Sequence, residues 1–211
     1  ITECNTFPNP EAILINKKLC NTLNLSINSK EELANLLLVK KTLNTSFSQA
    51  YAGHQFGHFT KLGDGRAIIL GEQLKDDKQR FDVQLKGSGR TPYSRRGDGK
   101  ATLKAMLREY LISEAIHYLN IPSSRSLTVI KTGEQINRET IHEGAVLARV
   151  MKSHIRVGTF EYAYYYCSKD NLKKLTSYTI NRLYPEINYH KNPPLSLLDR
   201  VMKNQIDLVV N

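Results

Sequence analysis

The chain has 211 residues, of which 40% are hydrophobic and 24% charged, and its formal net charge is +10. This composition is typical of a globular protein with one large domain or two small ones, and no apolar run approaches the roughly 18 residues that a membrane-spanning helix needs. The three cysteines, Cys4, Cys20 and Cys167, form no CxxC pair, which argues against a disulfide scaffold or a cysteine-based zinc site.

The first 50 residues predict short helices and loops. Ser29 is a candidate N-cap for a helix over 31–39, because Glu32 stands at the capping-box position. We therefore interpret residues 1–50 as an N-terminal helical extension.

The middle of the chain changes character. A segment rich in Gly, His and aromatic residues at 51–58 precedes two predicted strands, 67–70 and 81–85, which are separated by a polar turn. Residues 87–99 carry glycines and a proline and predict a loop. Apolar residues at i, i+3 and i+4 spacing then predict a helix over 101–119.

Further strands and helices complete the order of elements. The strands are expected at 126–131, 135–139 and 145–151, and amphipathic helices are expected at 171–183 and 197–209. This order indicates an α+β protein, with a small lobe of sheet and helix at 51–160 that leads into a helical lobe starting at 161–211.

Positive charge is concentrated between residues 86 and 108. The basic residues there are Lys86, Arg90, Arg95, Arg96, Lys100, Lys104 and Arg108. Such a cluster indicates an anionic partner, which could be a nucleotide, a nucleic acid or an acidic protein surface. Aromatic residues for base stacking are sparse nearby, so a nucleic-acid-binding module is the weaker alternative.

Lys86 ends a predicted strand, and Glu109 lies on the helix that follows. A strand lysine held by a helix carboxylate is how protein kinases orient a lysine onto ATP phosphates. The alternative is a solvated lysine, with Glu109 paired on the surface to its neighbour Arg108.

Two glycine-containing turns could bind phosphate. Gly63, Gly65 and Arg66 surround Asp64 just before a strand, where backbone amides and a guanidinium could reach an anion; an ordinary tight turn is equally compatible. The second turn, at 97–100, nearly matches a Walker A motif. It lacks the required glycine at Ser94 and the Ser or Thr at Ala101, so a P-loop is not expected.

Two arginines further along could also reach a phosphate. Arg149 lies among apolar residues of a predicted strand and needs an anionic partner if it faces inward. Arg156 follows seven residues later. The alternative is one edge-strand arginine and one loop arginine. His54 and His58 have HxxxH spacing, but the intervening segment is a poor helix, so packing roles are favoured over a metal site.

Taken together, these motifs resemble the selenoprotein O family. The matching segments, in the order in which the family has them, are YAGHQFG at 51–57, LGDGRA at 62–67, QLKGSGRTPYSRRGDGKA at 84–101, REYLISEA at 108–115, GAVLARV at 144–150 and SHIRVGTFE at 153–161. They cover most of residues 45–165. The resemblance implies a protein-kinase-like (pseudokinase) fold, with an N-lobe and the beginning of a helical C-lobe.

The resemblance also implies a function. Family members look like protein adenylyltransferases, which bind ATP end for end relative to a kinase and transfer AMP to Ser, Thr or Tyr hydroxyls of proteins. ATP with Mg²⁺, or alternatively Mn²⁺, would be required. The location would be cytoplasmic in a bacterium and mitochondrial in a eukaryote, with no membrane partner.

Individual residues can be matched to the family's site. Lys86 and Glu109 would form the ion pair that positions ATP. The other nucleotide contacts would be Gly63, Gly65, Arg66, Asp98, Gly99, Arg149 and Arg156, the two last holding the terminal phosphates of the inverted ATP. Lys100 departs from the arginine usual at its position, and positive charge is retained.

The family's catalytic aspartate and its magnesium-binding Asn and Asp lie in a later segment. No metal ligand is therefore expected within this chain, and the chain alone is expected to bind ATP weakly and not to catalyse. An ordinary protein kinase is the alternative within the same class, although it would not need the arginine pair.

Overall fold

The computed structural model describes residues 1–38, 45–55 and 57–210. They divide into two compact units, each of which combines separate parts of the chain. Unit 1 contains Ile1–Gln49 and Gly63–Lys152, and unit 2 contains Ala50–Leu62 and Ser153–Asn211. The segment 51–62, which we expected to open the mixed lobe, thus falls with the later helices.

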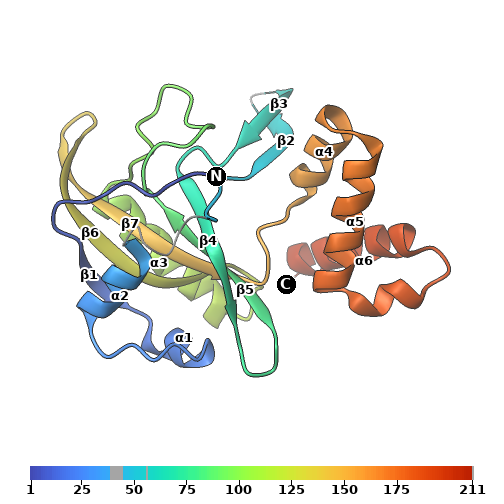
Figure 1. The fold of residues 1–211 in the computed structure, drawn as a ribbon, viewed down its shortest axis with the longest axis horizontal. Coiled ribbons are helices and arrows are strands. Elements are labelled where there is room, and N and C mark those ends of the chain that lie inside the picture. Colours follow the sequence, from blue (N-terminus) through green and yellow to red (C-terminus); the bar gives the residue numbers. More distant parts are fainter. Residues whose placement is uncertain (39–44, 56, 211) are drawn as a thin grey trace. The chain divides into compact units, whose positions relative to one another are not determined.

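Unit 1 is built on a five-stranded antiparallel sheet in the order β1-β6-β7-β5-β4 (Figure 1). Its elements are β1 (Glu11–Ile15), α1 (Lys17–Thr22), α2 (Lys30–Leu38), β4 (Ala67–Leu74), β5 (Arg80–Lys86), α3 (Leu103–Tyr118), β6 (Arg125–Asn137) and β7 (Ile141–Met151).

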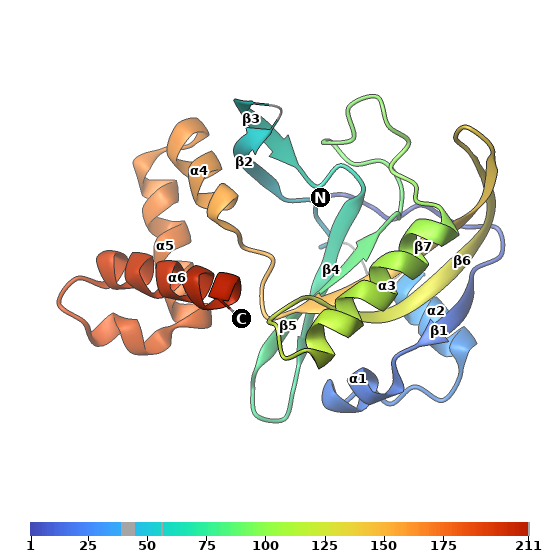
Figure 2. The same cartoon turned by 180° about the vertical axis from the view of Figure 1, so that it is seen from behind.

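The sheet is covered on both faces. One apolar cluster joins Leu85, Ile130 and Val146 to side chains of α1 and α2. A second cluster on the other face packs Leu147 and Val129 against α3, which lies across the sheet in Figure 2. Because side chains alternate along a strand, neighbouring residues of β7 enter different clusters.

The expected helix α3 is confirmed, with slightly tighter bounds. Thr102 is its N-cap and accepts a hydrogen bond from the backbone of Ala105. The helix ends next to Asn120, which has a positive φ of 63°, a backbone conformation that asparagine tolerates better than most residues.

The helix α2 is also confirmed. The Ser29 hydroxyl accepts from the backbone N–H of Glu32 at 3.0 Å, as a cap should, but the Glu32 carboxylate accepts from Asn28 rather than from the cap residue itself. Val39, where we expected this helix to end, lies outside the described residues.

Three strands were not expected from the sequence. β1 pairs with β6 inside the segment that we interpreted as helices and loops. β2 (Ala50–Gln55) and β3 (His58–Gly63) form a separate two-stranded sheet. In addition, the two strands expected at 126–131 and 135–139 are one continuous strand, β6, with an irregular register between Lys131 and Gln135.

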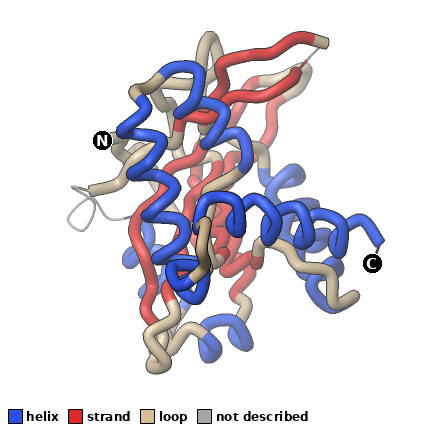
Figure 3. The backbone as a smooth tube through the Cα atoms, turned by 90° about the vertical axis from the view of Figure 1, so that its right-hand side faces the viewer, coloured by secondary structure: helices blue, strands red, loops and turns tan. Residues whose placement is uncertain are grey.

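The helices of unit 2 follow one another closely. They are α4 (Val157–Tyr166), α5 (Lys169–Leu183), the short 3-10 helix Pro185–Tyr189 and α6 (Pro193–Val210), drawn in blue in Figure 3. A small apolar cluster of Ile180, Ile187 and Leu197 joins them. Pro193 begins α6, because a first-turn proline has no helical N–H to lose.

Candidate functional site

A lysine from β5 and a glutamate from α3 meet on one face of the sheet. Lys86 Nζ lies 2.6 Å from Glu109 Oε2, and about a fifth to a quarter of each side chain is exposed. The contact expected from their order in the sequence is therefore present, and the surface pair of Glu109 with Arg108 is not what the structure forms. Their role in holding ATP stays a prediction.

Arg149 joins the same pair from β7. This strand lies between β6 and β5, so the alternative of an edge-strand arginine is wrong. Arg149 Nη1 donates to Glu109 Oε1 at 3.0 Å, and Arg149 Nε donates to Gln84 Oε1 at 3.1 Å. We call Gln84, Lys86, Glu109 and Arg149 the cationic cluster.

The cationic cluster carries more positive than negative charge, because two cations share one carboxylate. Burial lowers the pKa of Lys86 from its ordinary value, the hydrogen bond to Glu109 opposes this, and the charges of Arg149 and Arg66 lower it further. A bound anion would offset this repulsion between cations. An anion such as a phosphate group is therefore the kind of ligand whose charge would suit the cluster.

The turn at Gly63–Arg66 is packed closely against the loop at 87–99. The Tyr93 ring lies against Gly63 so closely that any Cβ would overlap it, and a Cβ on Gly65 would come 3.0 Å from the Tyr93 carbonyl. Ser94 Oγ donates to the Gly65 carbonyl at 2.5 Å. These contacts leave no room for a Cβ at Gly63 and little room at Gly65, and the Arg66 side chain is exposed beside them.

The carboxylate of Asp98 is already engaged by a neighbour. Arg138, from the turn between β6 and β7, donates to both of its oxygens at 2.8 and 2.9 Å, and this hydrogen bonding lowers the pKa of Asp98. Gly99 has a φ of +70° and lies against the Gly89 backbone. The 97–100 turn is therefore held in place from outside the loop.

Arg156 belongs to unit 2. It precedes α4, its guanidinium lies 4.2 Å from the centre of the Tyr51 ring, and its backbone N–H donates to the Thr159 hydroxyl. Of the predicted site residues, the structure thus gathers Lys86, Glu109 and Arg149, holds the two glycine turns nearby in the same unit, and assigns Arg156 to the other unit.

The two histidines of the HxxxH motif lie on strands, not on a helix. His54 is in β2 and packs edge-on against the Phe59 ring, and His58 begins β3. Within 1–38, 45–55 and 57–210, no group of three or more His, Cys, Asp or Glu side chains is arranged to hold a metal ion.

Two features of unit 1 were missed in the sequence. Gln84 belongs to a row of polar residues, Asp82, Gln84 and Lys86, at every second position of β5, and this alternation could have indicated a polar face. The other is a buried clasp: Glu114 accepts hydrogen bonds from both Arg125 and Asn16. No local pattern links these last three residues.

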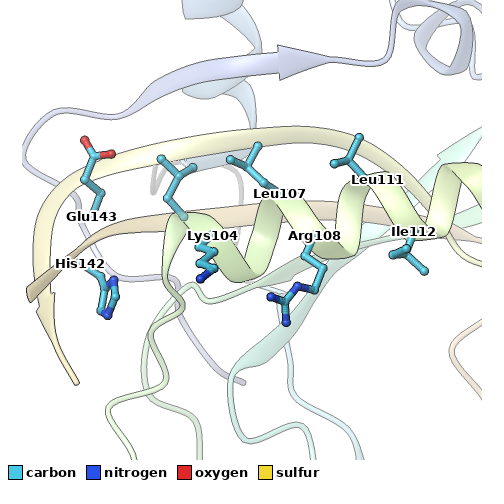
Figure 4. Close-up of a pocket in the computed structure, with 8 residues that line it drawn as sticks. Lys104, Leu107, Arg108, Leu111, Ile112, His142 and Glu143 are labelled. Atoms are coloured by element: carbon cyan, nitrogen blue, oxygen red, sulfur yellow. The ribbon is translucent and has the colours of Figure 1, made fainter. Parts of the chain in front are cut away.

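An apolar hollow of about 550 Å³ lies along α3, lined by side chains of this helix and of β7 (Figure 4). It is lined by Leu103, Lys104, Leu107, Arg108, Leu111, Ile112, His142 and Glu143. Leu111 and Ile112 are more than half exposed.

None of the helices in the described part of the chain combines the length and the apolar character needed to cross a membrane.

The sequence of the chain is similar to those of known proteins. A family model described as "Protein adenylyltransferase SelO" matches residues 1–211. The chain is 52% identical over 204 residues to "Protein nucleotidyltransferase YdiU" of Brevibacillus brevis, covering 95% of this chain and 42% of the relative. Proteins of the same name from Bacillus cytotoxicus (53% over 204 residues, 95% and 42%) and Pelagibacter ubique (50% over 207 residues, 96% and 43%) are similar. The chain thus spans about two fifths of the length of these relatives.

Proposed function

The chain belongs to the protein adenylyltransferase SelO family, and from this premise we propose that its protein transfers AMP from ATP to Ser, Thr or Tyr hydroxyls of other proteins. The observation that carries the proposal is the cationic cluster, in which Lys86 and Arg149 share the single carboxylate of Glu109. A polyphosphate is the kind of ligand that such a surplus of positive charge binds.

The arrangement also supports a kinase-like N-lobe. A lysine from a strand of an antiparallel sheet, paired with a glutamate from the helix packed on that sheet, is the arrangement that kinases use to orient ATP phosphates. We propose that Lys86 and Arg149 bind phosphate oxygens, that Gly63, Gly65 and Arg66 approach the nucleotide from their turn, and that Glu109 keeps the two cations aligned.

The remaining nucleotide contacts are proposed for the second turn and for unit 2. Asp98 and Gly99 would border the nucleotide, with Asp98 fixed by Arg138. Arg156 would hold terminal phosphates of an ATP that is inverted relative to a kinase. Its position before α4 suits an anion, since helix N-termini carry partial positive charge.

The proposed reaction is a substitution at the α-phosphorus. The acceptor hydroxyl oxygen forms a bond to this phosphorus, the bond from it to the bridging oxygen of the β-phosphate breaks, and pyrophosphate leaves while the hydroxyl proton passes to a base. Charge on the phosphates grows and moves during this step, so fixed cations such as Lys86 and Arg149 stabilise it. We assign the base to no residue of this chain.

We propose Mg²⁺, with Mn²⁺ as the alternative, as the ion that accompanies ATP. Bound to the phosphates, such an ion would neutralise part of their charge. The described residues offer no cluster of acidic side chains to hold it, and we derive no step from it.

The test uses the protein that carries this sequence, with all residues its gene encodes, in magnesium buffer. ATP labelled at the α-phosphate and ATP labelled at the γ-phosphate are supplied separately, and label on protein is measured. We expect label from the α-position only, reduced about 100-fold or more in Lys86→Ala. Lys17→Ala, an exposed lysine at the start of α1, is the matched control and should retain full labelling.

Other outcomes would contradict the proposal. Label from the γ-position only would identify a kinase. No label from either position, together with tight and salt-dependent binding of nucleic acid, would favour the nucleic-acid-binding module.

A further inference from the structure

Gln84 is a fully buried amide in the centre of the cationic cluster. Its side chain has a relative exposure of 0%, and it lies on β5 directly opposite Arg149 of β7 in the sheet register. Its Nε2 has no hydrogen-bond partner among the described residues. Buried polar groups are nearly always hydrogen-bonded, so a buried amide nitrogen without a hydrogen bond is unusual and indicates a role other than stability.

The other end of the amide is fully used. Gln84 Oε1 accepts from both Nε and Nη2 of Arg149, while Arg149 Nη1 donates to Glu109. The guanidinium is therefore held along one edge by a neutral acceptor and at another nitrogen by a charged one. Two fixed attachment points set the orientation of its plane.

The neutrality of Gln84 decides the charge of the cluster. Lys86 and Arg149 contribute two positive charges and Glu109 one negative charge, which leaves a surplus of one. Glutamate at position 84 would hold Arg149 equally well but would cancel that surplus. The buried Asp82 lies two residues before Gln84 on the same face of β5, and Arg66 adds positive charge near Lys86.

We infer that Gln84 is a positioning residue, which orients Arg149 toward a polyphosphate without adding a negative charge beside it. This inference rests on the proposed ATP site and identifies the neutral residue that orients one of its cations. Gln84 acts through Arg149 and need not touch the nucleotide. Its unsatisfied Nε2 is the stability cost that accompanies this role.

The inference separates stability from ligand affinity. An apolar side chain of similar size at position 84 removes the unsatisfied amide, which stabilises the fold. It also removes the acceptor for Arg149, which destabilises the fold, so the two changes in the free energy of unfolding oppose each other. A carboxylate keeps an acceptor for Arg149 and adds an ion pair. Neither replacement should strongly destabilise the fold, yet each should weaken anion binding for its own reason.

The experiment compares Gln84→Glu and Gln84→Met in the protein that carries this sequence. Binding of ATP and of inorganic tripolyphosphate is measured by calorimetry, and thermal midpoints are recorded beside it. We expect Gln84→Glu to bind both ligands about 10-fold more weakly or worse, Gln84→Met to lose about 3-fold to 10-fold, and both midpoints to move by less than about 4 °C. Gln79→Glu, which makes the same charge change at an exposed position of the β4–β5 turn, should bind as the wild type does.

The outcomes distinguish this inference from the proposed function. Affinity that Gln84→Glu leaves unchanged, or loss of affinity only in parallel with a large fall of the thermal midpoint, would overturn the inference and indicate a purely structural residue. A wild-type protein that binds no tripolyphosphate would overturn it as well. If the expected ranking holds but label comes from the γ-phosphate, the inference stands and only the proposed AMP transfer fails.

Discussion

Helix α3 carries two glutamates that both reach basic residues of the sheet, and they differ in what surrounds them. Glu109 is about a quarter exposed, and its carboxylate contacts two cations, Lys86 and Arg149. Glu114 is about a tenth exposed and accepts hydrogen bonds from Nε and Nη2 of Arg125, from Asn16 and from the backbone N–H of Ser126.

This difference separates the proposed binding site from a structural clasp. Every oxygen of Glu114 is satisfied and its charge is balanced by one arginine, so nothing remains for a ligand. The cationic cluster is more open, and there one carboxylate faces two cations. Two glutamates of the same helix thus differ in role, because different residues surround each carboxylate.

The largest effect is expected at the clasp. Glu114→Ala leaves Arg125 largely buried without its counter-charge, and it also removes the acceptor for Asn16. We expect a loss of about 3–5 kcal/mol in the free energy of unfolding, measured by urea denaturation. A loss below about 1 kcal/mol would show that Glu114 is not structural, and the comparison would fail.

At the cationic cluster the expected effect is on catalysis. Glu109→Gln removes the charge that aligns Lys86 and Arg149 but makes the cluster more positive. We therefore expect the rate of AMP transfer to fall about 100-fold, while the affinity for ATP does not fall. Steady-state kinetics and calorimetry measure the two separately. Glu139→Gln, at an exposed position beyond β6, is the matched control, and equal losses of rate and affinity would contradict the assignment of alignment to Glu109.

The pH dependence of stability sharpens the comparison. Burial raises the pKa of Glu114, but the hydrogen bonds from Arg125 and from the Ser126 backbone outweigh it, and the net shift is below the ordinary value of 4.5. Because the folded pKa is the lower one, the clasp stabilises the fold fully above that ordinary value, and the stabilisation is lost as pH falls through the folded pKa.

The corresponding measurement follows the wild type and Glu114→Gln by thermal unfolding from pH 7 downward. We expect an advantage of the wild type of about 1–3 kcal/mol at neutral pH, shrinking below about pH 4.5. An advantage that stays constant across this range would mean that the charge of Glu114 contributes nothing.

The smallest effect is expected at a third ion pair, between Asp98 and Arg138. Each side chain is about 40% exposed, so solvent screens the pair, and Arg138→Ala should cost less than about 1 kcal/mol in stability despite the bidentate geometry. The thermal midpoint should fall by at most about 4 °C. A larger fall would show that this pair stabilises the fold as strongly as a buried ion pair such as the clasp does.

The sequence predicted the elements whose signals are local. For helix α3, the apolar spacing, the cap at Thr102 and the end near Asn120 all lie within one short stretch of the sequence. The β4–β5 hairpin follows from two strand-like runs around a polar turn. The five residues of β1 carry no comparable signal, because their strand conformation depends on pairing with β6, more than 100 residues later.

The site was predictable to a similar degree. The Lys86–Glu109 contact follows from the order of a strand and a helix, so their sequence positions suggested it. The residues of β5 and their neighbours in sequence do not show which strands pair with β5. The position of Arg149 opposite Gln84 is therefore known only from the sheet order. The division of the chain, with β2 grouped with α4 and α5, likewise depends on contacts between distant segments.

The sequence by itself determined the α+β character, the family, and which residues carry charge near the expected nucleotide site, because periodicity and motifs are properties of neighbouring residues. The tertiary structure decided that one glutamate of α3 shares two cations while the other is enclosed by its partners. Charge balance and burial depend on which strands lie beneath each turn of the helix, and only the folded sheet fixes that order.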